Sequence, residues 1–509
     1  MNPIKNIVIV GGGTAGWMAA ASLQQHFKNL VNITLIESTE IGTIGVGEAT
    51  IPTIREFYHR LGMNDLDVMR ATNATCKLGI QFNDWHTISS ESKGSDSKAS
   101  QFIHPFGLYG QALDGIEFQH FWLKLKQKNL VGELGDYSLG VTLARNNKFT
   151  IPVKNPSSTL SVFDWALHFD ATLFAKLMRT YAEENGTTRI DAKVTQVNLR
   201  EHDGFIESLL LDTGDTITGD LFIDCSGFRG LLIEGALKTG YENWSHWLLC
   251  DTAFAVQSET TSAPNSYTNI TARPAGWQWK IPLQHRNGNG HVFSSRFMDD
   301  EQARTLLINN VNEKLLHEPR KISFTPGRRK QAWNKNCIAL GLAAGFLEPL
   351  ESTSIALIET GIEKIKMLFP DMSFRQSVID EFNEITALEY DRVRDFILLH
   401  YKLSARDDSD FWRYCRAMEV PDTLKHKMEL FKASGYVVRY RWEMFHLPSW
   451  LAIFTGFNYL PETYNRAVDN FDEQRLVASF KKMQQSLLTA SADAYDHADF
   501  IAKYCAAKK

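Results

Sequence analysis

Three short segments of this chain carry side chains that can do chemistry. Lys77 lies in Thr75-Cys76-Lys77-Leu78-Gly79-Ile80, Glu351 lies in residues 346–353, and Trp277 and Trp279 lie two positions apart in residues 276–282. An amine can hold a reactive group, and a carboxylate can accept a proton or stabilise a cation. Each also has an ordinary structural interpretation. These are a solvated lysine on a half-buried strand, a carboxylate near a helix start and two core tryptophans.

A glycine-rich segment near the N-terminus predicts a dinucleotide-binding site. Gly11, Gly13 and Gly16 form G-x-G-x-x-G between an apolar strand-like run at residues 6–10 and a helix-forming run at residues 15–27. The first glycine makes the turn, the second lets a pyrophosphate approach the backbone, and the third lets helix and strand pack closely. A glycine-rich turn without a ligand is the alternative.

The residues around this turn complete a strand–helix–strand unit. Thr14 and Ala15 stand at the start of the helix, whose free N–H groups and dipole favour phosphate. The next strand is expected at residues 32–36, and Glu37 at its end is placed to bind a ribose hydroxyl.

Two later segments favour FAD over NAD. Asp220–Gly227 and Cys337–Gly345 look like the strand-then-glycine elements with which FAD-dependent hydroxylase-type folds close over their cofactor. This likeness adds Gly227 and Gly341 to the expected flavin site. The chain has no second G-x-G-x-x-G, so it offers no nicotinamide site.

Together, the glycine pattern and the tryptophan pair resemble the flavin-dependent halogenases of the tryptophan halogenase family. The likeness is densest at residues 44–52, 75–80, 276–282 and 346–353, in the family's order. It implies an α/β (α+β) fold. Residues 1–370 would form an FAD-binding Rossmann-like module of the flavin monooxygenase type with interleaved substrate-site segments. Residues 371–509 would form a mostly helical module that completes the substrate pocket.

The resemblance also implies the reagents and the reacting groups. FAD would be used in its reduced form, FADH2, delivered by a separate flavin reductase, together with O2 and a halide ion. Lys77 would hydrogen-bond hypohalous acid or form a haloamine with it, and burial would favour its neutral form. Glu351 would stabilise the cation formed on the substrate ring and accept the ring proton, with Glu348 as the alternative.

The halide and the flavin would contact further residues of the same motifs. Thr353 and Ser354 hold the family's halide-binding place, although family members usually have glycine where this chain has Ser354. The residues expected against the flavin in these motifs are Gly47, Ala49 and Leu350.

Bulky residues are expected between the flavin and the substrate. Trp277, Trp279, Ile281 and Pro282 would form a rigid wall that keeps an organic substrate from the flavin and lets the small hypohalous acid pass. On the substrate side, the resemblance implies a ring platform, and its residues are His104, Pro105 and Phe106.

The C-terminal part departs from the tryptophan-specific members. Counting back from Gly456 places Ala433, Ser434 and Tyr440 where those members have a tyrosine pair and a glutamate that hold the amino acid's charged groups. Phe445 falls where they have a tryptophan that covers the ring. An indole, a phenol, a pyrrole or a larger aromatic therefore fits this sequence as well as free tryptophan does.

The whole chain is typical of a globular enzyme. It has 509 residues, 44% hydrophobic residues and a formal charge of −5, which gives no basic surface for nucleic acid. The six cysteines form no C-x-x-C pair, so we expect no metal site and a reducing cytoplasm. Met1–Lys5 leaves no room for a signal peptide, and glycines break the uncharged run at residues 6–27, so no membrane span is expected. A homodimer is compatible with the sequence.

Two other functions stay open. A single-component FAD-dependent aromatic monooxygenase would need to handle NAD(P)H and to bring its substrate to the flavin, which the tryptophan pair opposes. A non-catalytic flavin-binding protein would have no use for Lys77 and Glu351 together. The low-complexity segment Ser89–Ser100 would be the exposed loop at which such a protein docks a partner.

Overall fold

The computed structural model describes residues 2–40, 47–87, 101–156 and 158–507. Two sequence predictions lie outside the described residues: the flavin-facing positions 44–46 and the Ser89–Ser100 loop.

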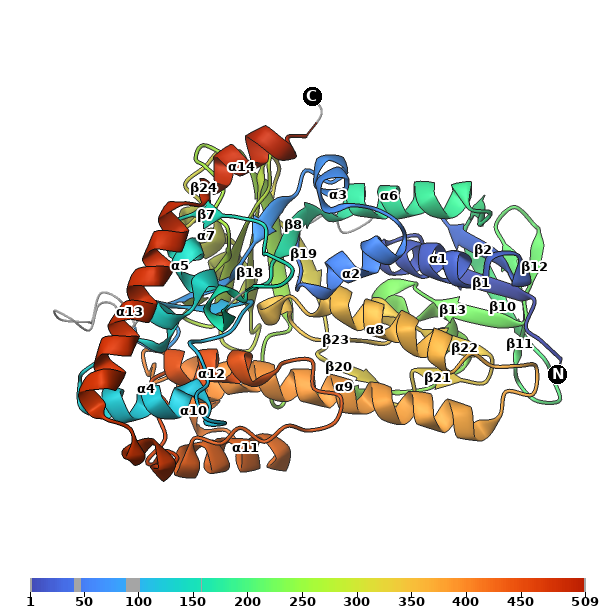
Figure 1. Cartoon of the computed structure of the whole chain (residues 1–509). Helices are drawn as coiled ribbons and strands as arrows, with labels where there is room; N and C mark the ends of the chain where they lie inside the picture. Colours follow the sequence, from blue (N-terminus) through green and yellow to red (C-terminus); the bar gives the residue numbers. More distant parts are fainter. Residues whose placement is uncertain (1, 41–46, 88–100, 157, 508–509) are drawn as a thin grey trace.

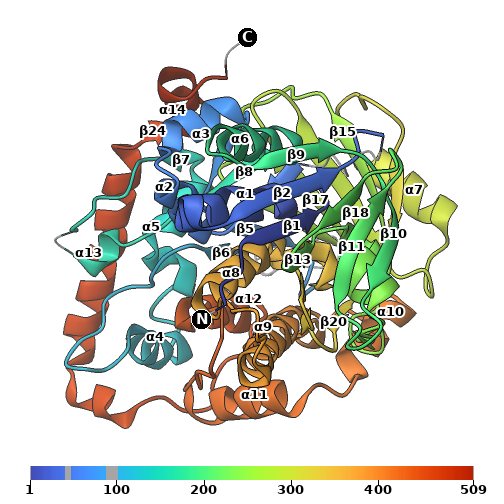
Figure 2. The same ribbon diagram turned by 90° about the vertical axis from the view of Figure 1, so that its right-hand side faces the viewer.

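A six-stranded sheet carries the glycine-rich turn (Figures 1 and 2). Its strands in spatial order are β21 (Trp333–Asn334), β22 (Cys337–Ala339), β13 (Leu221–Asp224), β1 (Asn6–Val10), β2 (Asn32–Glu37) and β9 (Thr188–Asp191), and all neighbours are parallel except β21 and β22. Strand β1 is central and apolar, as strands covered on both faces are. Helix α1 (Thr14–Phe27) connects β1 to β2, so the predicted strand–turn–helix–strand unit is confirmed.

A second, mostly antiparallel sheet carries the tryptophan motif. Its seven strands in order are β19 (Arg320–Ser323), β15 (Thr252–Ser258), β18 (Asn287–Phe293), β17 (Gly276–Pro282), β16 (Thr268–Arg273), β5 (Gly79–Asn83) and β6 (Gln101–Pro105). Trp277 and Trp279 lie on the central strand β17. A Cβ atom on Gly290 of β18 would lie 2.1 Å from the Trp279 ring, so glycine is needed opposite this indole.

A small three-stranded sheet stands between these two and holds Lys77. Strands β3 (Gly47–Ala49) and β4 (Thr75–Lys77) both pair antiparallel with β8 (Ala166–Asp170). The chain leaves β4 at Leu78 and enters another sheet as β5, and Thr75, Cys76 and Lys77 are all buried. Both sides of β4 are covered, so Lys77 is not a solvated lysine on a half-buried strand.

The part after residue 370 is mainly helical, as predicted (Figure 1). Its α-helices are α9 (Gln376–Lys402), α10 (Asp410–Ala417), α11 (Asp422–Ser434), α12 (Leu447–Gly456), α13 (Glu473–Ala492) and α14 (His497–Tyr504). Helix α12 packs on β6 so closely that a Cβ atom on Gly456 would lie 2.4 Å from Phe102. The largest apolar core contains side chains from both sides of residue 370, and a division at that point stays a prediction.

Three whole-chain features complete the description. All six cysteines are buried free thiols. Within the part of the chain that the structure describes, no helix combines the length and the apolar character needed to cross a bilayer. Over the same residues, no three or more histidine, cysteine, aspartate or glutamate side chains gather in a way that suits a metal ion.

Candidate active site

Lys77 is an amine enclosed by protein. Its Nζ donates hydrogen bonds of 2.8 Å to the carbonyl oxygen of Thr50 and to Oγ of Ser352, and it lies 5.1 Å from the ring centre of Phe106. Burial disfavours its charged form and lowers its pKa to about 7, against the opposing influence of Glu351. A large fraction of the lysine is therefore a neutral, nucleophilic amine near neutral pH.

Glu351 is a buried carboxylate held by two histidines. His104 Nδ1 lies 2.8 Å from Oε2, and His400 Nε2 lies 2.7 Å from Oε1. Burial alone would raise the pKa of Glu351, but the charge and hydrogen bonds of His104 and His400 lower it to about 2. Glu351 is therefore a carboxylate at neutral pH, and it is available to accept a proton or to stabilise a cation.

Glu348 lies one short turn earlier and has different partners. Its Oε2 accepts hydrogen bonds of 2.6 Å from Trp277 Nε1 and from the Tyr401 hydroxyl, while Oε1 is buried with no partner among the described residues. Burial raises the pKa of Glu348 to about 7 despite these two bonds. Glu348 thus connects the tryptophan strand to helix α9.

The turn that carries both glutamates leads into helix α8 (Ser354–Met367). Ser352, which binds Lys77, has a left-handed backbone with φ of 60°, a conformation that is uncommon for residues other than glycine. The Thr353 side chain is buried, and its hydroxyl has no partner among the described residues. Ser354 is the first residue of α8. The two predicted halide residues therefore adjoin the Lys77–Ser352 contact.

Aromatic rings surround the Lys77–Glu351 region. His104 and Phe106 have ring centres 6.4 Å apart, and Pro105 between them ends β6. Phe445 lies 6.2 Å from His104 and stacks on Phe396 of α9 at 3.9 Å. Phe445 therefore lies beside His104, and one of its faces is already covered by Phe396.

The tryptophan strand borders the same region. Trp277 and Trp279 have ring centres 5.9 Å apart at 55°, and Ile281 and Pro282 follow on β17. Thr75 of β4 donates a 2.7 Å hydrogen bond to the Pro282 carbonyl, which links the Lys77 strand to the tryptophan strand.

The glycine-rich turn is shaped for a dinucleotide. Gly11 has φ of +115°, and a Cβ atom on Gly16 would lie 1.8 Å from the Gly11 carbonyl oxygen, so the predicted close packing is present. A Cβ atom on Gly13 would have nothing within 4 Å, which leaves open space before α1. Helix α1 has no side-chain cap and no acidic residue in its first turn, so Thr14 and Ala15 begin a helix end that suits phosphates.

The other predicted flavin contacts are spread over several elements. Glu37 ends β2, where it accepts bonds from Arg189 Nε at 2.6 Å and Trp17 Nε1 at 3.3 Å; a carboxylate retains lone pairs for a further donor. Gly227 has φ of +72° and open space at its Cβ position. Gly341 touches α1 so closely that a Cβ atom would lie 2.8 Å from the Ala15 side chain. Gly47 and Ala49 are on β3, and Leu350 is buried in the glutamate turn.

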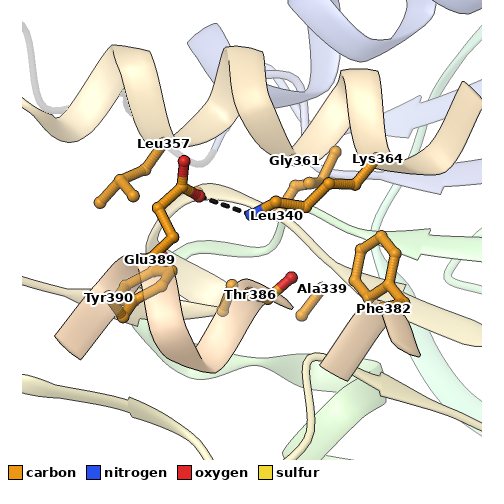
Figure 3. A pocket seen from close by; sticks show the side chains of 11 residues that line it. Ala339, Leu340, Leu357, Gly361, Lys364, Phe382, Thr386, Glu389 and Tyr390 are labelled. Atoms are coloured by element: carbon orange, nitrogen blue, oxygen red, sulfur yellow. Dashed lines mark hydrogen bonds and ion pairs between the residues drawn. The ribbon is translucent and has the colours of Figure 1, made fainter. Parts of the chain in front are cut away.

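A cavity behind Gly341 was not predicted from the sequence. Figure 3 shows it between α8 and α9, where Lys364 reaches Glu389 in a buried ion pair of 2.5 Å. The Thr386 hydroxyl also lines it and has no partner among the described residues. Its lining residues include neither Lys77 nor Glu351.

Ala433, Ser434 and Tyr440 occupy the positions where tryptophan-specific members hold the amino acid's charged groups, and they lie on or beside α11. Ala433 and Ser434 end that helix, and the Ser434 hydroxyl donates to Leu430 within it. Tyr440 lies 2.7 Å from His426 Nδ1. Glu443 is buried and already paired with Lys427, which also lies 3.8 Å from the Trp450 ring centre.

Sequence reasoning missed four contributors to the site: Thr50, Ser352, Phe396 and His400. Thr50 acts through its backbone oxygen, which leaves no signal in residue type. Ser352 acts through its hydroxyl, which only the conformation of the turn directs at Lys77. Phe396 and His400 lie in the part after residue 370, of which the sequence predicts only that it is mostly helical and completes the substrate pocket. A histidine within Phe396-Ile397-Leu398-Leu399-His400 is the one signal that was available.

Comparisons with known proteins agree with this architecture. The sequence model of the tryptophan halogenase family matches residues 6–473. The tryptophan 6-halogenase ThaL of Streptomyces albogriseolus is 36% identical over 447 residues, which cover 85% of this chain and 82% of ThaL.

Two solved structures extend the likeness over nearly the whole chain. BrvH, a flavin-dependent halogenase from Brevundimonas sp. BAL3, is 56% identical with a TM-score of 0.93, covering 98% of this chain and 99% of BrvH. A flavin-dependent halogenase from Xanthomonas campestris is 41% identical with a TM-score of 0.94, covering 99% of both chains.

Fold and site thus define a flavin-dependent enzyme that halogenates aromatic substrates. The chain belongs to the tryptophan halogenase family. The predicted family and the predicted α/β fold with a helical C-terminal part are confirmed.

Proposed function

We propose that this protein uses FADH2, O2 and bromide or chloride to halogenate an indole-like or other electron-rich aromatic substrate, with hypohalous acid held at Lys77. The observation that carries this proposal is the buried amine of Lys77, fixed by Thr50 and Ser352 beside the carboxylate of Glu351. FAD would be bound by the residues around Gly11, Gly13, Gly16 and Glu37. When bound and reduced, it would supply with O2 the oxidising power that converts halide to hypohalous acid.

Lys77 would present the halogen to the ring. Its neutral amine either hydrogen-bonds hypohalous acid or reacts with it, forming an N–X bond and releasing water. The ring's π electrons then form the C–X bond as the bond to halogen breaks. Because both Thr50 and Ser352 hold Nζ, the halogen would be offered to one ring position rather than to several.

Glu351 would complete the substitution. Its carboxylate stabilises the positive ring intermediate, then takes the ring proton and restores aromaticity, while a proton returns to the Lys77 nitrogen. Thr353 and Ser354 would hold halide beside this pair. His104, Pro105, Phe106 and Phe445 would position the ring, and the Trp277–Pro282 wall would exclude it from the flavin.

A substrate panel tests the proposal. The protein, a flavin reductase, NADH, FAD and bromide are incubated with indole, phenol, pyrrole, tryptophan and larger aromatics, and products are scored by mass spectrometry for bromine isotope pairs. We expect brominated product that requires both bromide and Lys77. Hydroxylated product formed without halide would indicate the aromatic monooxygenase. Flavin binding without any aromatic product across the panel would indicate the non-catalytic flavin-binding protein.

A further inference from the structure

We propose that His400 is a protonated positioning residue whose positive charge keeps Glu351 ionised and offsets the pull of that carboxylate on a proton at Lys77. This inference rests on the proposed function, because it concerns how the same two groups are held in their reactive states. It assigns a role to a residue of α9 whose side chain is fully buried.

Hydrogen-bond accounting around the His400 ring places two protons on it. Nδ1 lies 2.8 Å from the carbonyl oxygen of Phe396, and Nε2 lies 2.7 Å from Oε1 of Glu351. A backbone carbonyl and a carboxylate only accept hydrogen bonds, so both ring nitrogens must donate. A neutral imidazole has one N–H, and the pair therefore holds one proton more than a neutral histidine beside a carboxylate.

That proton belongs on the histidine rather than on the glutamate. Glu351 receives a second N–H donor, His104 Nδ1, on its other oxygen, so both carboxylate oxygens are stabilised as acceptors. The His104 ring faces only one acceptor, because its Nε2 has no partner among the described residues, and so it does not require a second proton. His400 is the ring with acceptors on both sides.

Glu348 provides an internal comparison. Glu348 and Glu351 are each 1% exposed, and each receives two hydrogen bonds. The donors to Glu348 are the neutral indole of Trp277 and the hydroxyl of Tyr401, and burial raises its pKa to about 7. The donors to Glu351 are two histidines, whose charge and hydrogen bonds, those of His104 first, lower its pKa to about 2. Neutral donors do not offset burial at Glu348, whereas partners that can carry charge do so at Glu351. Of the two rings, His400 is the one whose acceptors on both sides require the charge.

The surroundings of His400 leave it no other charged partner among the described residues. The ring is packed by Phe82 at 5.1 Å, Phe396 at 5.3 Å, and Trp85 and Phe457 at 6.2 Å each. The titratable groups of the cluster are Glu351 and Glu348 from the turn, His104 from β6, Lys77 from β4 and Tyr401, the next residue of α9. Without a positive charge on His400, Glu351 and Lys77 would keep one more proton between them up to a higher pH, whichever of the two groups carries it.

The test is the pH dependence of halogenation in His400→Gln. Glutamine can still donate a neutral hydrogen bond to Glu351 but carries no charge. The measured quantity is brominated product per O2 consumed, with reductase in excess. Both profiles are recorded in the Glu348→Gln background, which removes the titration of Glu348, so that the acidic limb reports the Lys77–Glu351 pair. We expect the limb to move upward by about one pH unit or more. Phe457→Leu is the control, because it changes the packing against the His400 ring without removing the charge. The acidic limb of its pH profile should stay where it is in the wild type.

If folded His400→Gln shows the acidic limb of its pH profile at the same pH as the protein with His400, the proposal is overturned. A neutral hydrogen bond to Glu351 would then be enough to keep the carboxylate ionised. If that variant does not fold, infrared difference spectra of the wild type against Glu351→Gln at neutral pH decide the matter. Loss of carboxylate bands supports a proton on His400, and loss of a protonated-carboxyl band overturns it. Either failure leaves the proposed function intact, since that depends on halide- and Lys77-dependent product in the wild type.

Discussion

Lys77 Nζ and Ser352 Oγ lie 2.8 Å apart although 275 positions separate them in the sequence. The contact joins β4 to the turn that bears both glutamates and the two candidate halide residues. Ser352 reaches Lys77 from a left-handed backbone conformation, so the turn itself aims the hydroxyl. The amine is therefore fixed from two sides, by a strand and by a turn, and its position is set before any substrate arrives.

Lys77→Ala should abolish halogenated product while flavin reoxidation and hypohalous acid formation continue, because Lys77 acts after halide oxidation. Lys77→Met, which fills most of the same volume without an amine, should give the same result and controls for a collapsed cavity. Product would be measured by mass spectrometry and hypohalous acid with a trapping dye. Near-wild-type product in either variant would exclude the proposed role of the amine.

Glu351→Gln should lower turnover about a hundredfold, the size expected from losing roughly 3 kcal/mol of transition-state stabilisation. Glutamine cannot take the ring proton or match the negative charge. Glu348→Gln keeps a carbonyl oxygen for Trp277 and Tyr401, so we expect a much smaller loss. Steady-state rates of both variants, with FAD binding checked by fluorescence, distinguish them; the reverse order would assign the role to Glu348.

Halogenation should rise with pH through about 7 in the wild type. The pKa of Lys77 is lowered to about 7 by burial, so below that value the amine is protonated and cannot bind halogen as a nucleophile. The pKa of Glu348 also lies at about 7, and Glu348→Gln removes that titration. Product per O2 would be followed from pH 5.5 to 9. Persistence of the rise in Glu348→Gln assigns it to Lys77, and its disappearance would assign it to Glu348.

Much of the fold follows from local sequence, but the candidate active site follows only in part. The apolar run at residues 6–10, the glycines and Glu37 predict β1, α1 and β2 because strand, turn and helix each depend on neighbouring residues. Lys77 and Glu351 carry no such local signal, and only the resemblance to a family singled them out. Contacts such as Lys77 with Ser352, or His400 with Glu351, depend on how distant segments pack.

Bromide should outperform chloride. Bromide is the softer nucleophile and is more easily oxidised, so it depends less on a well-formed halide site. Ser354 opens α8 where the family usually has glycine, and Thr353 beside it has a buried hydroxyl without a partner among the described residues. Competition at equal salt concentrations gives the product ratio, and Ser354→Gly should raise the chlorinated share. A chlorinated majority from the wild type would contradict this expectation.

Free indole should be halogenated with a higher kcat/KM than free tryptophan. The ring platform of His104 and Phe106 is present at the site. The positions where tryptophan-specific members hold the amino acid's charged groups lie on or beside α11 in this chain. The Glu443 side chain in that region is buried and already paired with Lys427. Burying an α-carboxylate and an α-ammonium without partners costs several kcal/mol, more than ring stacking returns.

Tryptophan should therefore bind weakly, or with its charged end in solvent, and the difference from indole should lie mainly in KM. Kinetics on both substrates under one reductase supply measure it, and tryptamine and indole-3-propionate separate the ammonium from the carboxylate. If both monocharged analogues fall between indole and tryptophan, each charge carries its own desolvation cost. A kcat/KM for tryptophan above that for indole would mean that residues other than those counted from Gly456 hold the amino acid.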